Sequence, residues 1–189
     1  ETLPSFALQP HPATPSSAIR NVEVTVLLTA AGEWQLAYHI VGNLDQVVLP
    51  AVGTAERRDE LWRHTCCELF CRIDGAAAYQ ELNFSPSNSW AAYDFDAYRT
   101  GQRDSVLLTA PMMRLSNEVG VRPLERVLRL EIEMRVRPAM QRQQIGCATV
   151  IELTDGSLSY WALAHPLDRP DFHHPASFAK HLIPDEVLP

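Results

Sequence analysis

The sequence lacks a surplus of positive charge. Its 16 lysine and arginine residues are outnumbered by 23 aspartate and glutamate residues, and the net charge is −7. A surface of this sign repels the phosphates of nucleic acids and of anionic membranes. The composition therefore argues against nucleic acid or a membrane surface as the partner of this protein.

Two kinds of hydrophobic segment are also missing. No apolar run is long enough to span a bilayer. The sequence does not open with the basic residues and apolar stretch that make up a signal peptide. We therefore expect a cytoplasmic protein, and nothing in the sequence indicates its oligomeric state.

Cysteine is scarce, with four residues in the chain. Cys66 and Cys67 are adjacent, so on a strand they point to opposite faces. Cys67 and Cys71 share a face but lie roughly 13 Å apart, too far for a disulfide. We expect these three cysteines and Cys147 to be reduced, buried thiols in a cytosolic protein.

Familiar catalytic and cofactor motifs are absent. The chain has no nucleophilic serine elbow, phosphate-binding loop or dinucleotide fingerprint. It also lacks the Cys-x-x-Cys-His motif that attaches haem covalently. His64 and Cys66 are two residues apart on a strand, about 7 Å, which is too far for a catalytic dyad.

The chain has the length and composition of one domain over residues 1–189, and 46% of its residues are hydrophobic. We expect residues 1–18 to form a proline-rich N-terminal arm on the surface, and residues 166–189 a proline-rich C-terminal tail. In the tail, we expect one short helix at 176–182.

Alternating apolar and polar residues recur at short intervals between turn signals. This pattern predicts eight or nine strands, at 21–29, 34–40, 66–73, 79–84, 90–96, 113–119, 126–137, 145–153 and 158–164, with a further short strand expected at 46–49. The clearest is 126–137, where we expect even-numbered residues to be buried and odd-numbered residues exposed. Strands of this kind with little helix indicate an all-β fold, an antiparallel sandwich or barrel.

The segment 57–98 combines a charged loop with three consecutive strands. If the strands pair in order, Leu69, Leu82 and Phe84 face the core. We expect the opposite face to collect acidic, amide and aromatic side chains, namely Tyr79, Glu68, Glu81, Asn83, Trp90, Asp94 and Asp96. Such a face is too acidic for a core and rich in hydrogen-bonding groups.

These residues carry a resemblance to a known family. The succession of Arg58, 61–62, Thr65, 68–70 and 79–86 resembles the DOMON superfamily, and within it the proteins grouped with family 9 carbohydrate-binding modules. The stretches 159–166 and 170–175 resemble a bacterial DOMON-like subgroup. The resemblance implies a jelly-roll-like β-sandwich that binds a sugar or a haem.

The same resemblance implies a set of ligand-binding residues. Its polar members are Arg58, Glu68, Glu81 and Asn83, its stacking platforms are Trp62 and Trp161, and His165 follows at the rim. Carboxylates and amides hydrogen-bond to sugar hydroxyls, and flat aromatic rings stack on the sugar. We expect these residues to converge on one pocket, with Arg58 or Arg72 between the two carboxylates. Both tryptophans could instead pack in the core, and the carboxylates could belong to an ion-pair network.

Three other functions stay open. A haem-binding electron-transfer domain would take axial ligands from Met112, Met113, Met134, Met140, His165, His173 and His174. A glycoside hydrolase would use Glu68 and Glu81 as its carboxylate pair. A metal site would draw on His64, Cys66, Glu68, His165, His173 and His174, and a structural calcium on Asp94 or Asp96. Among these functions, we expect a non-catalytic domain without a cofactor that binds a small ligand, a carbohydrate.

Overall fold

The computed structural model describes residues 3–137 and 140–184. Residues 1–2 of the expected arm and 185–189 of the expected tail lie outside this description. The strands are β1 (Ser5–Pro10), β2 (Ile19–Leu28), β3 (Glu33–Gly42), β4 (Glu56–Arg57), β5 (Cys66–Ile73), β6 (Tyr79–Phe84), β7 (Ser89–Phe95), β8 (Arg103–Asp104), β9 (Thr109–Val119), β10 (Arg126–Arg135), β11 (Gln143–Glu152), β12 (Leu158–Ala162) and β13 (Lys180–Leu182). Three short 3-10 helices are η1 (Leu44–Gln46), η2 (Leu61–Arg63) and η3 (Pro175–Ser177).

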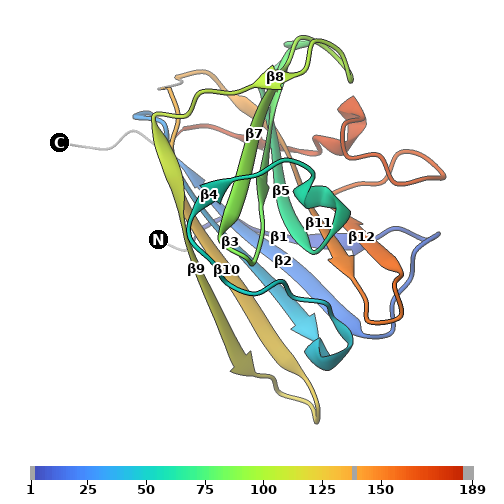
Figure 1. Cartoon of the computed structure of the whole chain (residues 1–189). Coiled ribbons are helices and arrows are strands. Elements are labelled where there is room, and N and C mark those ends of the chain that lie inside the picture. The colour runs from blue at the N-terminus through green and yellow to red at the C-terminus, as the bar shows by residue number, and fades with distance from the viewer. Residues whose placement is uncertain (1–2, 138–139, 185–189) are drawn as a thin grey trace.

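The strands form one sheet that curls into two packed layers, shown in Figure 1. Its order is β4-β7-β6-β5-β11-β12-β1-β2-β3-β10-β9, with β8 and β13 pairing at the side of this path. Strand β1 joins the layers, because residues 5–8 pair with β2 and residues 9–10 pair with β12. Apart from the parallel β4–β7 pair, the pairing is antiparallel. The predicted all-β sandwich is therefore confirmed.

The main hydrophobic core fills the space between the two layers. Val24 and Leu128 come from one layer and Leu69 and Leu82 from the other, and all four are almost fully buried. The Tyr38 hydroxyl crosses the core and donates a 2.6 Å hydrogen bond to the backbone oxygen of Glu68 on the opposite layer. Together, these contacts fix the side of β5 that faces away from the core.

A second apolar cluster covers part of the outer face of the β5–β6–β7 layer. Phe70 and Tyr79 belong to the sheet, and Phe172 and Phe178 of the C-terminal segment pack in the same cluster. Phe178 contacts the rings of Phe70 and Tyr79, and Phe172 contacts that of Tyr160. Gly146 makes this approach possible, because a Cβ atom there would lie 2.9 Å from the ring of Phe178. The C-terminal segment is thus a packed cover of the sheet.

Several predicted elements are confirmed and others need correction. Strand β10 has the expected alternation, from Leu128 to Met134. The N-terminal arm is not a surface appendage, since Ser5–Pro10 is the strand that connects the layers. Of the short strand expected at 46–49, Gln46 ends η1 and Val47 forms an isolated β-bridge to Leu153, and the tail contains η3 and β13 in place of the predicted short helix.

The orientation expected for β7, the third strand of the segment 57–98, is wrong. In the ladder of β6 and β7, Glu81 lies opposite Tyr93 and Phe84 lies opposite Trp90. Trp90 therefore packs against the core, and Tyr93 shares the outer face with Glu81. Because β7 carries aromatic residues on both faces, its alternation alone could not show which face is buried.

All four cysteine side chains are buried thiols. Burial raises the pKa of Cys67, Cys71 and Cys147 to about 12 in each case. These thiols are therefore protonated and unreactive at neutral pH. In the part of the chain that the structure describes, no helix is long and apolar enough to cross a membrane.

Candidate functional site

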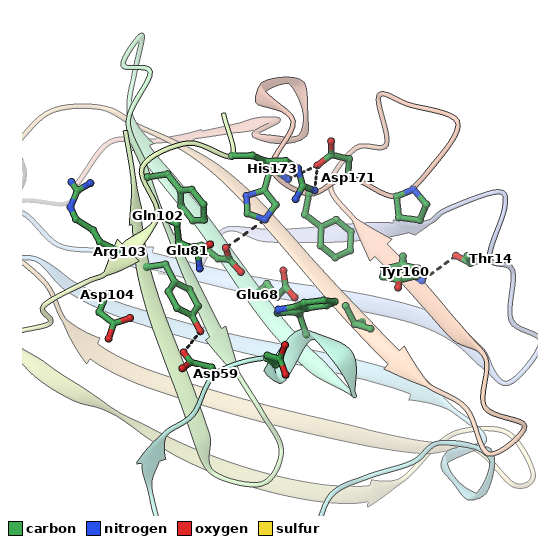
Figure 2. Close-up of a pocket in the computed structure, with 18 residues that line it drawn as sticks. Thr14, Asp59, Glu68, Glu81, Gln102, Arg103, Asp104, Tyr160, Asp171 and His173 are labelled. Atoms are coloured by element: carbon green, nitrogen blue, oxygen red, sulfur yellow. Dashed lines mark hydrogen bonds and ion pairs between the residues drawn. The ribbon is translucent and has the colours of Figure 1, made fainter. Parts of the chain in front are cut away.

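A cavity of about 880 Å³ opens on the outer face of the layer that contains β5, β6 and β7. Strands β5, β6, β7, β11 and β12 provide its floor, and four segments surround it (Figure 2). These segments are the loop after β1 at Thr14, the residues around η2, the stretch at 99–104 that includes β8, and the C-terminal stretch at 170–173. The cavity therefore gathers residues from both ends and from the middle of the chain.

Two carboxylic acids form the polar floor. Glu68 and Glu81 line the cavity, yet the two residues are only 3% and 5% exposed. Glu81 accepts a 2.9 Å hydrogen bond from the side-chain amide of Asn83. Oε1 of Glu68 is buried and has no hydrogen-bond partner in residues 3–137 and 140–184. A buried, unpaired acceptor beside a cavity is costly unless a ligand or water satisfies it.

The environment favours the protonated form of both acids. Burial raises the pKa of Glu68 well above its ordinary range, and the nearby Glu81 raises it further. Burial also raises the pKa of Glu81 to about 6, although the hydrogen bond from Asn83 and the charge of Arg99 oppose this. Because two adjacent carboxylates repel each other, this pair retains a proton at neutral pH.

His173 approaches this pair from the C-terminal segment. Its Nε2 atom lies 3.6 Å from Oε2 of Glu81, and its Nδ1 atom lies 2.8 Å from the hydroxyl of Tyr79. Burial and the charge of Arg99 lower the pKa of His173 to about 4. The imidazole is therefore neutral at pH 7 and brings no positive charge to Glu81.

Asp171 fixes the position of the C-terminal segment. It is buried and accepts hydrogen bonds from Arg99 (2.8 Å), from the Tyr98 hydroxyl and from the backbone of His173 (3.1 Å). Burial opposes ionisation, but the hydrogen bonds from Tyr98 and Arg99 lower the pKa of Asp171 below its ordinary value. This ionised group locks residues 170–173 against the loop that follows β7.

Aromatic side chains line the walls. Trp62 on η2 is 47% exposed and contributes to the cavity lining. Tyr93 donates a 2.6 Å hydrogen bond to Asp59, which ties the segment before η2 to the sheet. Tyr160 of β12 and Phe172 lie on the side of the C-terminal segment. The cavity thus combines apolar ring surfaces with buried carboxyl groups.

Of the seven site residues expected from the sequence, the structure brings three into this cavity: Trp62, Glu68 and Glu81. Asn83 is fully buried and supports the cavity through its bond to Glu81. The expected arginine does not lie between the carboxylates. Arg58 is exposed and pairs with Glu56, while Arg72 bonds to Gln144.

The expected positions of Trp161 and His165 are wrong. Trp161 lies opposite Thr149 in the β11–β12 ladder, faces the main core and donates to the hydroxyl of Ser159 (3.0 Å). Its neighbour Tyr160 points to the cavity. His165 lines a separate hollow beside His11, where it bonds to the backbone of Gln9 (2.8 Å). Strand β12 is apolar on both faces, so its orientation was ambiguous.

Other cavity residues were not identified from the sequence as ligand-binding: Thr14, Asp59, Tyr93, Arg99, Tyr160, Asp171 and Phe172. His173 was considered only as a haem or metal ligand. The stretch 170–175 carried part of the family resemblance, and this was the one available signal for Asp171 and His173. Asp171 bonds to Tyr98 and Arg99, and His173 contacts Tyr79 and Glu81. These contacts join residues far apart in the sequence and leave no periodic trace.

The described residues contain no group of three or more histidine, cysteine, aspartate or glutamate side chains placed to hold a metal ion. For haem, Met134 is buried in the main core, and none of the four methionines, all of them described, lines the cavity. The cavity therefore does not offer the methionine–histidine pair that haem ligation was expected to use.

Solved structures with a similar fold include the following two. One is a proposed carbohydrate-binding protein from Bacteroides uniformis, with a TM-score of 0.65 and 16% identity over 92% of this chain and 83% of that one. The other is a family 9 carbohydrate-binding module from Caldicellulosiruptor kristjanssonii in complex with glucose, with a TM-score of 0.55 and 9% identity over 98% and 86% of the two chains. The fold resembles that of a carbohydrate-binding module. No protein-family profile and no curated protein sequence matches the chain.

Proposed function

We propose that the cavity binds a small carbohydrate and that the protein is a non-catalytic binding domain of the DOMON type. The observation that carries this proposal is the combination of an unpaired, buried oxygen of Glu68 with an exposed tryptophan, Trp62, around one cavity. A sugar presents hydroxyl groups to the first and an apolar ring face to the second.

The cavity has the chemistry that a sugar requires. Glu68 and Glu81 lie on neighbouring strands, and the hydrogen bond from Asn83 makes Glu81 a fixed acceptor, which can discriminate between hydroxyl arrangements. A partly exposed indole ring binds the apolar face of a pyranose at a small cost in conformational entropy. The two proteins with similar folds support the proposal, since the structure of one of them, the family 9 carbohydrate-binding module, was solved in complex with glucose.

A glycoside hydrolase is the second candidate, favoured by one observation. Glu68 and Glu81 are neighbouring acids, and burial raises the pKa of Glu68, as it does that of the general acid in glycosidases. The neutral His173 lies beside the pair, with its Nε2 atom 3.6 Å from Oε2 of Glu81.

Calorimetric titration of the protein with neutral monosaccharides and disaccharides tests the binding proposal. We expect at least one sugar to bind, and Trp62→Ala to weaken its binding roughly tenfold or more through loss of the stacking surface. Glu133→Gln is the matched control, because Glu133 is exposed on β10, away from the cavity.

Absence of binding across the panel would overturn the proposal. Chromatography of the disaccharides after incubation separates the two candidates, since a hydrolase releases monosaccharides and a binding domain does not.

A further inference from the structure

The cavity carries an excess of negative charge. Six acidic residues line it, namely Asp59, Glu60, Glu68, Glu81, Asp104 and Asp171, against two arginines, Arg99 and Arg103. Such an imbalance in a partly enclosed site attracts a cation and disfavours an anion.

The acids at the rim already have cationic partners. Asp59 and Asp104 bond to Arg57, and Asp171 bonds to Arg99. The second arginine of the cavity, Arg103, donates to Asp96 outside it. The ion pairs of these arginines are therefore made with residues other than the floor acids, and Arg99 influences Glu81 through its charge.

The floor acids have no such partner in the described part of the chain. Within residues 3–137 and 140–184, no arginine or lysine forms a salt bridge with Glu68 or Glu81, and His173, 3.6 Å from Glu81, is the one basic side chain paired with either. Glu68 also retains a buried oxygen with no hydrogen bond. A positively charged donor is the group that completes this arrangement.

We propose that the ligand is an amino sugar whose protonated primary amine lies between Glu68 and Glu81. This inference rests on the proposed sugar-binding function and narrows its ligand class. An ammonium group supplies three hydrogen-bond donors, enough to reach both carboxylates, and a neutral hydroxyl supplies one. A metal ion fits less well, because no group of three or more ligating side chains occurs in residues 3–137 and 140–184.

Binding of the ammonium group displaces the proton that the two acids retain. The proton leaves to solvent as the amine replaces it, and both carboxylates become ionised beside a positive charge. Desolvated charge pairs of this kind contribute strongly to affinity. The neutral sugar has no equivalent of this interaction.

Parallel titrations of the intact protein with glucosamine, glucose and N-acetylglucosamine at pH 7 test the proposal. These probes share a ring, and acetylation keeps the nitrogen while removing its charge. We expect glucosamine to bind at least about tenfold more tightly than glucose. Glu68→Gln should bring the ratio of the two affinities close to one. This change keeps the shape of the side chain, and circular dichroism checks that the variant is folded.

The outcomes separate the two proposals. Tighter binding of glucosamine supports both. Glucose or N-acetylglucosamine binding as tightly as glucosamine overturns the amine proposal and leaves sugar binding in place. If none of these sugars nor any neutral sugar of the wider panel binds, both proposals fail.

Discussion

Asn83 lies directly opposite Glu68 in the β5–β6 ladder, yet its side-chain amide donates its 2.9 Å hydrogen bond to Glu81. The amide thus orients one carboxyl group and leaves Oε1 of its cross-strand neighbour unpaired. This division makes Glu81 a fixed acceptor and Glu68 an open one. The proposed binding site follows from this difference between two acids on one floor.

Glu81 should make stability depend on pH. The pKa of Glu81 rises from 4.5 to about 6 on folding. The contribution of this group to the free energy of unfolding is therefore fully present below pH 4.5 and is lost as the pH rises through 6. The corresponding free energy is about 2 kcal/mol. Glu81→Gln should therefore gain about 2 kcal/mol relative to the wild type between pH 4.5 and pH 7.5.

Urea denaturation at several pH values measures this difference, with Glu133→Gln as the control. The titratable and charged groups around Glu81 are Glu68 on β5, Arg99 in the loop after β7, and Asp171 and His173 in the C-terminal segment. A difference between variant and wild type that does not change with pH would contradict the expected burial of this carboxyl group.

His173 should remain neutral in mildly acidic solution. Its pKa falls from 6.5 to about 4 on folding, so its contribution to stability is present above pH 6.5 and is lost as the pH falls through 4. Nuclear magnetic resonance of the ring nitrogens should show a neutral imidazole at pH 5. A ring that titrates near pH 6.5 would mean that His173 is not buried.

The two tryptophans proposed from the sequence should behave differently. Trp161 is 4% exposed in the main core, so Trp161→Ala should lower the free energy of unfolding by about 3–5 kcal/mol. Trp62→Ala should change it by less than about 1 kcal/mol and weaken ligand binding instead. Chemical denaturation and calorimetric titration measure the two effects. The opposite pattern would restore Trp161 as the binding residue.

Asp171 should hold the C-terminal wall of the cavity in place. Asp171→Asn removes the charge that holds Arg99 and should cost about 1–3 kcal/mol of stability. It should also accelerate amide hydrogen exchange in residues 171–178 and weaken ligand binding, because Phe172 and His173 lose their anchor. Asp168→Asn is the control, since Asp168 is exposed and lies outside this cavity. Unchanged exchange in both variants would show that other contacts hold the segment.

The orientation of a strand could be predicted from the sequence where one of its faces is apolar and the other is charged. Strand β10 was predicted correctly because charged residues occupy one face and apolar residues the other. Glu68 and Glu81 were placed on the correct face for the same reason. Strands β7 and β12 carry apolar residues on both faces, so Trp90 and Trp161 were assigned to the wrong side.

Contacts between distant segments were beyond prediction from periodicity. Asp171 and His173 reach the cavity through packing of the C-terminal segment, which the sequence indicated as a proline-rich tail that carries part of the family resemblance. Similarly, Arg58 was expected between the carboxylates on the basis of proximity in sequence. In the folded chain, it points outward to Glu56. The resulting lack of a cation near Glu68 is visible only in three dimensions.

Chemical-shift mapping on the isotope-labelled protein tests the location of the binding site most directly. Addition of the sugar that binds most tightly should shift the signals of Trp62, Glu68, Tyr160 and His173, which surround one cavity. Signals near His11 and His165, which line the other hollow, should not move. Shifts confined to that second hollow, or no shifts with any sugar, would contradict the assignment of this cavity as a carbohydrate-binding site.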